Sequence, residues 1–154
     1  MRKIFSEVNK AYISGLLDGD GAIMACIEKH AEKKFGFRIR IYIKISQNNF
    51  KILNWCKFIT GIGNVRNVSG NEYEWLVRNQ EDARLLLELL LPYLKIKKKQ
   101  ANLARRILNT KIKTTKRLLK TAELADALSK LNVRSQGRRK NFMAMIQESI
   151  SPND

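Results

Sequence analysis

Apolar and polar residues follow two different periods along the chain, and this separates predicted helices from predicted strands. Apolar residues recur at helical spacing in three segments, which predicts helices over residues 7–18, 49–60 and about 81–91. Either Asn48 or Asn49 can act as the N-cap of the second helix, because an asparagine side chain accepts a hydrogen bond from the first helical turn.

Two pairs of segments have the period of two that is typical of half-buried strands, at residues 22–30 with 36–47 and at 64–68 with 72–78. Residues 36–47 give the clearest signal, because four isoleucines alternate with polar side chains. One face of this strand therefore carries apolar side chains for a core, and the other carries hydrogen-bond donors and a ring. The two sets are Ile39, Ile41, Ile43 and Ile45 on the first face, and Arg38, Arg40, Tyr42 and Lys44 on the second.

The element order predicts an α+β fold, αββαββα, with a four-stranded antiparallel sheet and extra C-terminal helices. Further helices are expected up to about residue 109, over 115–131 and over 138–150, the last after a break at Gly137. Residues 1–110 are predicted to form the αββαββα core, and residues 111–154 to add helices to the same domain.

Helices on one face of such a sheet leave the opposite face bare. A twisted β-ribbon fits the major groove of DNA, where arginine and lysine read guanine edges and amides read adenine. The bare face and its hairpin ends supply the residues predicted to contact DNA: Glu28, His30, Lys34, Arg38, Arg40, Tyr42, Lys44, Asn64, Arg66, Glu74 and Arg78.

The charge of the chain points to the same kind of partner. Thirty Lys and Arg against 14 Asp and Glu give a net charge of +16, and 16 of the basic but only 4 of the acidic side chains lie in residues 95–154. Such an excess favours a polyanion, most often nucleic acid. A membrane is not expected as a partner, because no apolar run reaches the length of a spanning helix. One histidine and two cysteines without CxxC spacing argue against a zinc site and favour reduced thiols in an intracellular protein.

The stretch Ile-Ser-Gly-Leu-Leu-Asp-Gly-Asp-Gly at residues 13–21 carries the candidate chemistry. Gly15 and Gly19 share one helix face and permit close contact with another helix. The Gly19-Asp20-Gly21 run is expected to end the helix, because glycine adopts the left-handed conformation that closes helices. Asp18 and Asp20 near this end oppose the helix dipole, and a divalent cation would compensate them.

This stretch resembles the LAGLIDADG motif of homing endonucleases. Ser14 stands where that motif prefers alanine and Gly19 where it often has alanine, and both are small residues. Residues 92–103 resemble a second segment of the single-motif members, and the likeness covers roughly residues 7–110. The resemblance implies a homodimer whose two motif helices pack together and place one acidic residue from each chain side by side. Here that residue is Asp20, with Gly19 lending a carbonyl to Mg²⁺ or another divalent cation such as Mn²⁺. The implied dimer interface contains Tyr12, Ser14, Gly15 and Gly19.

The resemblance also assigns roles around Asp20. Gln47 matches a glutamine near the hydrolytic water, and Lys97 matches a lysine near that water and the scissile phosphate. Lys51 falls where some members have arginine. Metal-assisted hydrolysis needs no side-chain nucleophile, which agrees with the scarcity of histidine.

The sequence thus predicts a site-specific double-strand DNA endonuclease that acts on a long, pseudo-palindromic target as a homodimer. Two alternatives use the same basic surface: an RNA maturase that assists intron splicing, for which RNA is a possible partner, and a non-catalytic DNA-binding regulator. The resemblance implies an intron-encoded gene. An organelle, an archaeal cytoplasm and a bacterial cytoplasm all remain open as the compartment.

Overall fold

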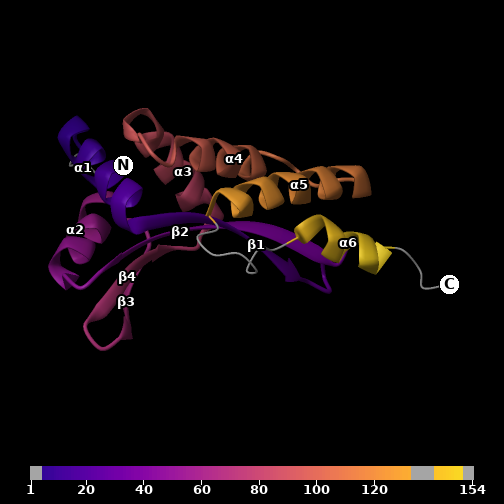
Figure 1. The fold of residues 1–154 in the computed structure, drawn as a ribbon, viewed down its shortest axis with the longest axis horizontal. Helices are drawn as coiled ribbons and strands as arrows, with labels where there is room; N and C mark the ends of the chain where they lie inside the picture. The colour runs from indigo at the N-terminus through magenta and orange to yellow at the C-terminus, as the bar shows by residue number, and fades with distance from the viewer. Residues whose placement is uncertain (1–4, 133–140, 151–154) are drawn as a thin grey trace.

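The computed structural model describes residues 5–132 and 141–150, and its elements follow the predicted αββαββα order with additional C-terminal helices (Figure 1). The elements are α1 (Glu7–Asp20), β1 (Gly21–Lys29), β2 (Phe37–Gln47), α2 (Phe50–Thr60), β3 (Asn64–Ser69), β4 (Glu72–Val77), α3 (Gln80–Leu90), a 3₁₀ turn η1 (Leu91–Tyr93), α4 (Lys98–Leu108), α5 (Thr115–Asn132) and α6 (Phe142–Ile150). The expected break at Gly137 lies outside the described residues.

The four strands form one antiparallel sheet in the order β1-β2-β4-β3. The long β2 is central, and the whole of β1 pairs with it, from Gly21 opposite Ile45 to Lys29 opposite Phe37. This confirms the antiparallel sheet that the sequence predicted. It also joins the end of β2 to the turn between α1 and β1, where the motif ends.

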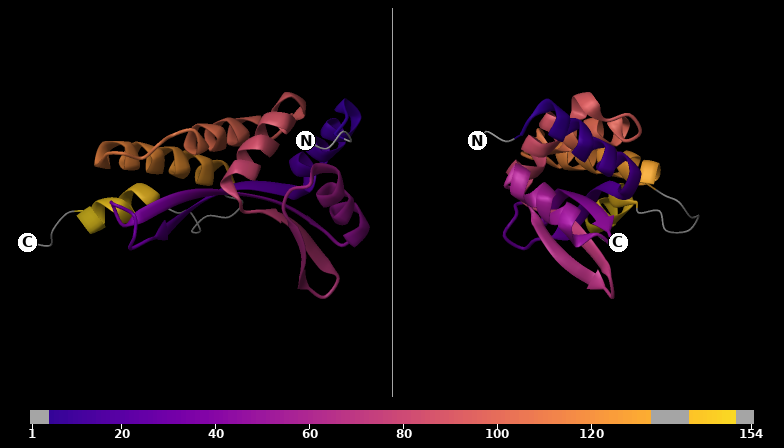
Figure 2. Two further views of the ribbon diagram at one scale, coloured as in Figure 1. Left: turned by 180° about the vertical axis from the view of Figure 1, so that it is seen from behind. Right: turned by 90° about the vertical axis from the view of Figure 1, so that its left-hand side faces the viewer.

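Helices α1, α3, α4 and α5 cover one face of the sheet (Figure 1). On the opposite face, no helix of the described residues covers the strands, and that face is arched between the β1–β2 and β3–β4 hairpins (Figure 2). The helix-covered face of β2 is apolar as predicted, because Ile41, Ile43 and Ile45 are at most 1% exposed. Buried residues of α5 and α6, such as Leu128 and Phe142, belong to the same core.

The end of α1 differs from the expectation. The helix continues to Asp20, and the chain enters β1 directly at Gly21, whose φ of −110° is not left-handed. Glycine is needed there for a different reason: a Cβ would lie 2.8 Å from both the Leu17 and Lys44 carbonyl oxygens. Close packing of strand on helix, and not a helix-closing glycine conformation, therefore fixes this residue.

The described part of the chain has no helix with both the length and the apolar character that crossing a membrane requires.

Candidate active site and nucleic-acid interface

Asp20 and Gln47 meet at the junction of α1, β1 and β2. Asp20 is the exposed last residue of α1, and Gln47 is the last residue of β2. The Gln47 Nε2 donates a hydrogen bond of 2.5 Å to the Asp20 Oδ2. The pairing of β1 with β2 creates this contact, because it places the start of β1 beside the end of β2. Two predicted catalytic residues that lie 27 positions apart are thus brought together.

Asp18, two residues earlier, has a different environment. Its carboxylate is 8% exposed and accepts hydrogen bonds from the backbone N–H groups of Lys95 at 2.7 Å and Lys97 at 2.9 Å. The expected need for a cation at Asp18 is therefore wrong, because backbone donors already compensate its charge. Only Asp20 remains as an exposed carboxylate at this helix end.

Lys97 is buried and donates from Nζ to the Asp18 carbonyl oxygen at 2.6 Å. Its ammonium group therefore lies at the last turn of α1, where the helix dipole favours a cation. This places a positive charge near the Asp20 end of the helix. Lys51 is exposed in the first turn of α2, in a hollow that also includes Asn48, Asn49, Phe50, Asn71 and Tyr73.

The outer face of α1 is lined by small or exposed side chains. Gly15 and Gly19 are exposed, and a Cβ built at either would meet nothing within 4 Å. Tyr12 is 51% exposed and meets Trp55 edge to face at 5.6 Å between ring centroids. Ser14 differs from the expectation: it is fully buried and donates to the Leu90 carbonyl at 3.2 Å. Ser14 precedes the exposed Gly15 in the helix but packs inside its own chain, so in the isolated chain it is not on the face that is open to a second helix.

One cluster of the predicted DNA-binding residues lies on the uncovered sheet face around Glu28. The Tyr42 hydroxyl donates to Glu28 at 2.7 Å and the Arg38 Nε at 2.5 Å, and these bonds hold the pKa of the Glu28 carboxyl below its usual range. The Arg40 and Arg78 guanidinium groups stack near the Tyr42 ring, at 5.7 and 5.2 Å from its centroid. The cluster thus presents cations and a ring in a fixed arrangement.

A second cluster on the same face centres on Glu74, which is only 4% exposed. Arg66 donates to its carboxylate from Nε at 2.6 Å, and the Lys44 Nζ lies 3.9 Å away. Little of the Glu74 carboxylate is left for a base edge, so its direct contact with DNA does not fit the isolated chain. The buried charge instead orients Arg66 and Lys44.

The remaining predicted contacts lie at the ends of this face. Asn64 is exposed on the edge strand β3, opposite Leu76. His30 and Lys34 lie in the connection between β1 and β2, with Lys34 exposed and His30 half-buried. Sequence reasoning missed Gln80. Its side-chain amide accepts a hydrogen bond from the Ile41 N–H and donates one to the Ile41 carbonyl, both at 2.8 Å, and so continues the pairing of β2 beyond the end of β4. No sequence pattern around Gln80 predicts this contact with a residue 39 positions away.

Comparisons with known proteins identify the relatives of this chain. The family model described as LAGLIDADG endonuclease matches residues 13–107. The DNA endonuclease I-CvuI of Chlorella vulgaris is 30% identical over 143 residues, covering 90% of this chain and 86% of that protein. The DNA endonuclease I-CreI of Chlamydomonas reinhardtii is 30% identical over 99 residues, covering 63% and 60%.

Solved structures show the same fold. The structure of I-CvuI in complex with the I-CreI target in the presence of Mg covers 92% of each chain, with a TM-score of 0.82 and 27% identity. The archaeal intron-encoded homing endonuclease I-Vdi141I, complexed with DNA, has a TM-score of 0.80 at 22% identity and supports the fold alone. The architecture and the exposed carboxylate at the end of a glycine-bearing helix define a single-motif protein of the LAGLIDADG type. The chain belongs to the LAGLIDADG endonuclease family.

Proposed function

We propose that this chain is a homing endonuclease that hydrolyses both strands of a specific duplex DNA as a homodimer, with a divalent cation at Asp20. The observation that carries the proposal is the state of the two motif carboxylates. Asp18 is satisfied by backbone donors, whereas Asp20 is exposed, and within the described ranges no cation pairs with it. A carboxylate held at a helix end by a single amide is suited to bind a cation.

DNA docks on the arched sheet face. The face carries the arginines and the lysine of the two clusters, and the β-ribbon shape suits the major groove. Glu28 and Glu74 on this face are each held by cations and so set the direction of the guanidinium groups. Fixed direction favours sequence-specific contacts, because bidentate readout of a base requires a defined geometry. The solved complexes of I-CvuI, a protein of the same fold, with DNA targets support duplex DNA as the partner.

A second copy of the chain completes the site. The described residues contain no cluster of three or more His, Cys, Asp and Glu side chains able to hold a metal, and Asp20 is the one side-chain ligand that we assign to each chain. The open face of α1 at Gly15 and Gly19 allows another helix to approach closely, since no side chain from the described part of the chain occupies it. Two such helices bring two Asp20 carboxylates together.

The donor set fits a hard cation. The Asp20 carboxylate and the Gly19 carbonyl are oxygen ligands, which favour Mg²⁺ or Mn²⁺. When bound, such a cation activates a water for attack and neutralises charge on the phosphoryl oxygens. The chain itself orients the Asp20 carboxylate through the Gln47 amide and adds positive charge from Lys97 behind the helix end. Lys51, which is exposed and lies four residues after Gln47 in the sequence, supplies a further cation for the phosphate backbone.

The test is cleavage by Asp20→Asn, with Glu123→Gln as a matched control, since Glu123 is an exposed carboxylate on α5. The wild type and the control are incubated with Mg²⁺ and a plasmid library of candidate intron-insertion sites, and the ends are sequenced. We expect the control to cut like the wild type, and Asp20→Asn to bind the recovered site without cutting it. Unchanged cleavage by Asp20→Asn would overturn the assignment of the cation site.

The same assay separates the alternatives. A protein that binds the site equally with EDTA and never nicks it is a regulator, and one that only assists intron splicing is a maturase. If the protein stays monomeric on DNA in sedimentation experiments, the proposal of an active site shared between two chains is contradicted.

A further inference from the structure

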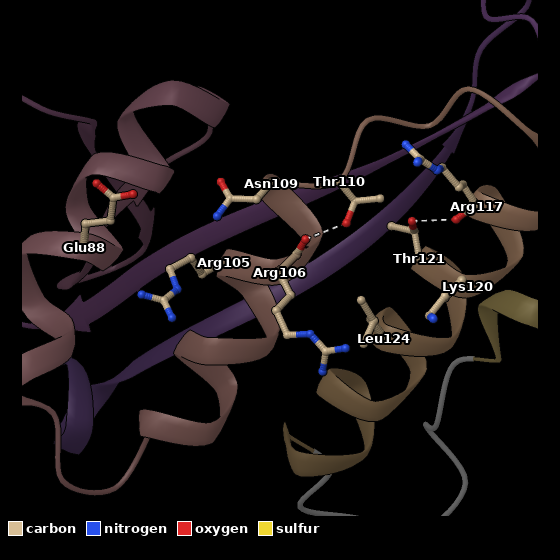
Figure 3. Close-up of a pocket in the computed structure, with 9 residues that line it drawn as sticks. All are labelled: Glu88, Arg105, Arg106, Asn109, Thr110, Arg117, Lys120, Thr121 and Leu124. Carbon is tan, nitrogen blue, oxygen red and sulfur yellow. Dashed lines mark hydrogen bonds between the residues drawn. The ribbon is translucent and has the colours of Figure 1, made fainter.

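A basic cavity lies on the helical side of the molecule, between α3, α4 and α5, with the sheet behind it in Figure 3. Its volume is about 490 Å³, within the range of roughly 300–1,000 Å³ that small-ligand sites have. The described lining consists of Glu88, Arg105, Arg106, Asn109, Thr110, Arg117, Lys120, Thr121 and Leu124. Four cations and one carboxylate thus surround a space that the proposed DNA face does not include.

These cations have no acidic partners. Within residues 5–132 and 141–150, no Asp or Glu forms an ion pair with Arg105, Arg106, Arg117 or Lys120. Neighbouring Arg84, in contrast, pairs with Glu81 at 2.8 Å. On the sheet face, too, buried or half-buried carboxylates hold Arg38 and Arg66. No ion pair among the residues that the structure describes therefore compensates the positive charge of this cavity.

Helix dipoles explain only half of this charge. Arg105 and Arg106 lie in the last turn of α4, where cations are favoured. Arg117 lies in the first turn of α5, at the end where the dipole disfavours a cation, and no acidic residue occupies that turn. Arg117 thus opposes the dipole, and Arg117 and Lys120 both add positive charge beside the other two cations. A bound anion would remove this repulsion.

We propose that this cavity is a second anion site, which binds adjacent phosphate groups of a polyphosphate or of a nucleic-acid strand other than the duplex on the sheet. Figure 3 shows Arg106 and Lys120 extending into the space between α4 and α5 beside Leu124. Arginine and lysine are the side chains that bind phosphate oxygens most strongly.

The lining also indicates what is not recognised. No aromatic side chain is among its described residues, so stacking on a base is not available. The Thr110 hydroxyl donates to the Arg106 carbonyl and the Thr121 hydroxyl to the Arg117 carbonyl, each at 2.7 Å, which leaves both hydroxyls as acceptors. Binding therefore reads charge and spacing of phosphates and not base sequence. The exposed Lys111 and Lys113 in the connection between α4 and α5, and Lys116 in the first turn of α5, continue the basic surface.

The experiment compares the full-length protein with Arg106→Gln/Lys120→Gln and with a control, Lys57→Gln/Lys130→Gln. The control removes the same charge from exposed lysines of α2 and α5 that do not line the cavity. Two probes are titrated with the target duplex bound: inorganic tripolyphosphate by calorimetry, and a labelled single-stranded oligonucleotide by fluorescence anisotropy. Duplex cleavage is measured in parallel.

We expect the cavity variant to lose about tenfold in affinity per cation removed, the loss of one charge-assisted hydrogen bond, while the control keeps its affinity and both cleave duplex normally. Tripolyphosphate binding alone would assign a small polyphosphate, and oligonucleotide binding alone a strand; each supports the site. Equal losses in the control, or binding of neither probe, would overturn the proposal. Loss of duplex cleavage in the cavity variant would also overturn it, because the cavity would then belong to the cleaved duplex.

Discussion

Replacing Asp18 tests how the C-terminal end of α1 is held to the segment before α4. The Asp18 carboxylate is 8% exposed and accepts two backbone hydrogen bonds, at 2.7 and 2.9 Å. A hydrogen bond to a charged group contributes about 1.5–3 kcal/mol, and an unsatisfied buried N–H costs a comparable amount. Asp18→Ala loses both bonds, so we expect the free energy of unfolding to fall by about 3–5 kcal/mol.

Asp18→Asn keeps one acceptor oxygen and turns an amide NH₂ toward the other N–H. We therefore expect it to lose roughly half as much, about 2 kcal/mol. The matched control is Asp20→Asn, because Asp20 is exposed and a surface substitution changes stability by about 0.5 kcal/mol or less. The two aspartates thus separate: substitution of Asp18 affects folding, and substitution of Asp20 affects cleavage.

The assay is urea denaturation at one fixed protein concentration, since association changes apparent stability. The order expected is wild type and Asp20→Asn together, then Asp18→Asn, then Asp18→Ala. If Asp18→Ala lowers the free energy of unfolding by less than about 1 kcal/mol, the reasoning is refuted, because the two hydrogen bonds to the carboxylate would then contribute little to stability. An equal loss in Asp20→Asn would refute it as well.

Four further outcomes follow from the same contacts. Gly15→Ala is expected to stabilise the isolated helix by about 1 kcal/mol, because its Cβ meets no neighbour, yet to weaken dimerisation in sedimentation velocity; a tighter dimer would contradict the proposed interface. The pKa of Glu28 is lowered in the folded state, so the stability it contributes is present above its ordinary value of 4.5 and lost as pH falls below that; the difference in unfolding free energy between wild type and Glu28→Gln should shrink toward acid pH. Burial raises the pKa of the Cys56 thiol to about 12, so a thiol reagent at pH 8 should modify it only after unfolding. EDTA should stop cleavage, and added Mg²⁺ should restore it; cleavage that persists in EDTA would exclude the metal role.

Local patterns were enough for the element order and the two faces of the sheet. A period of two identifies a strand and its buried side, and β2 buries Ile41, Ile43 and Ile45 accordingly. An asparagine N-cap and the end of α2 at Gly61, with a φ of 70°, also follow from the residues themselves, although the sequence left Asn48 and Asn49 open and the structure uses Asn49. These features depend on neighbours within a few positions, so a single sequence contains them. The resemblance of residues 13–21 to a known motif added Asp20 and, through it, Gln47.

Tertiary structure alone decided what the polar residues of the motif do. Ser14 bonds to a carbonyl 76 positions away, and Asp18 bonds to backbone groups 77 and 79 positions away. Glu74 is buried because the register of β3 and β4 places Arg66 opposite it. Sequence spacing cannot distinguish Asp18 from Asp20, since both are acidic residues at one helix end. Their difference arises from burial and from hydrogen-bond donors that only the packing of distant segments supplies.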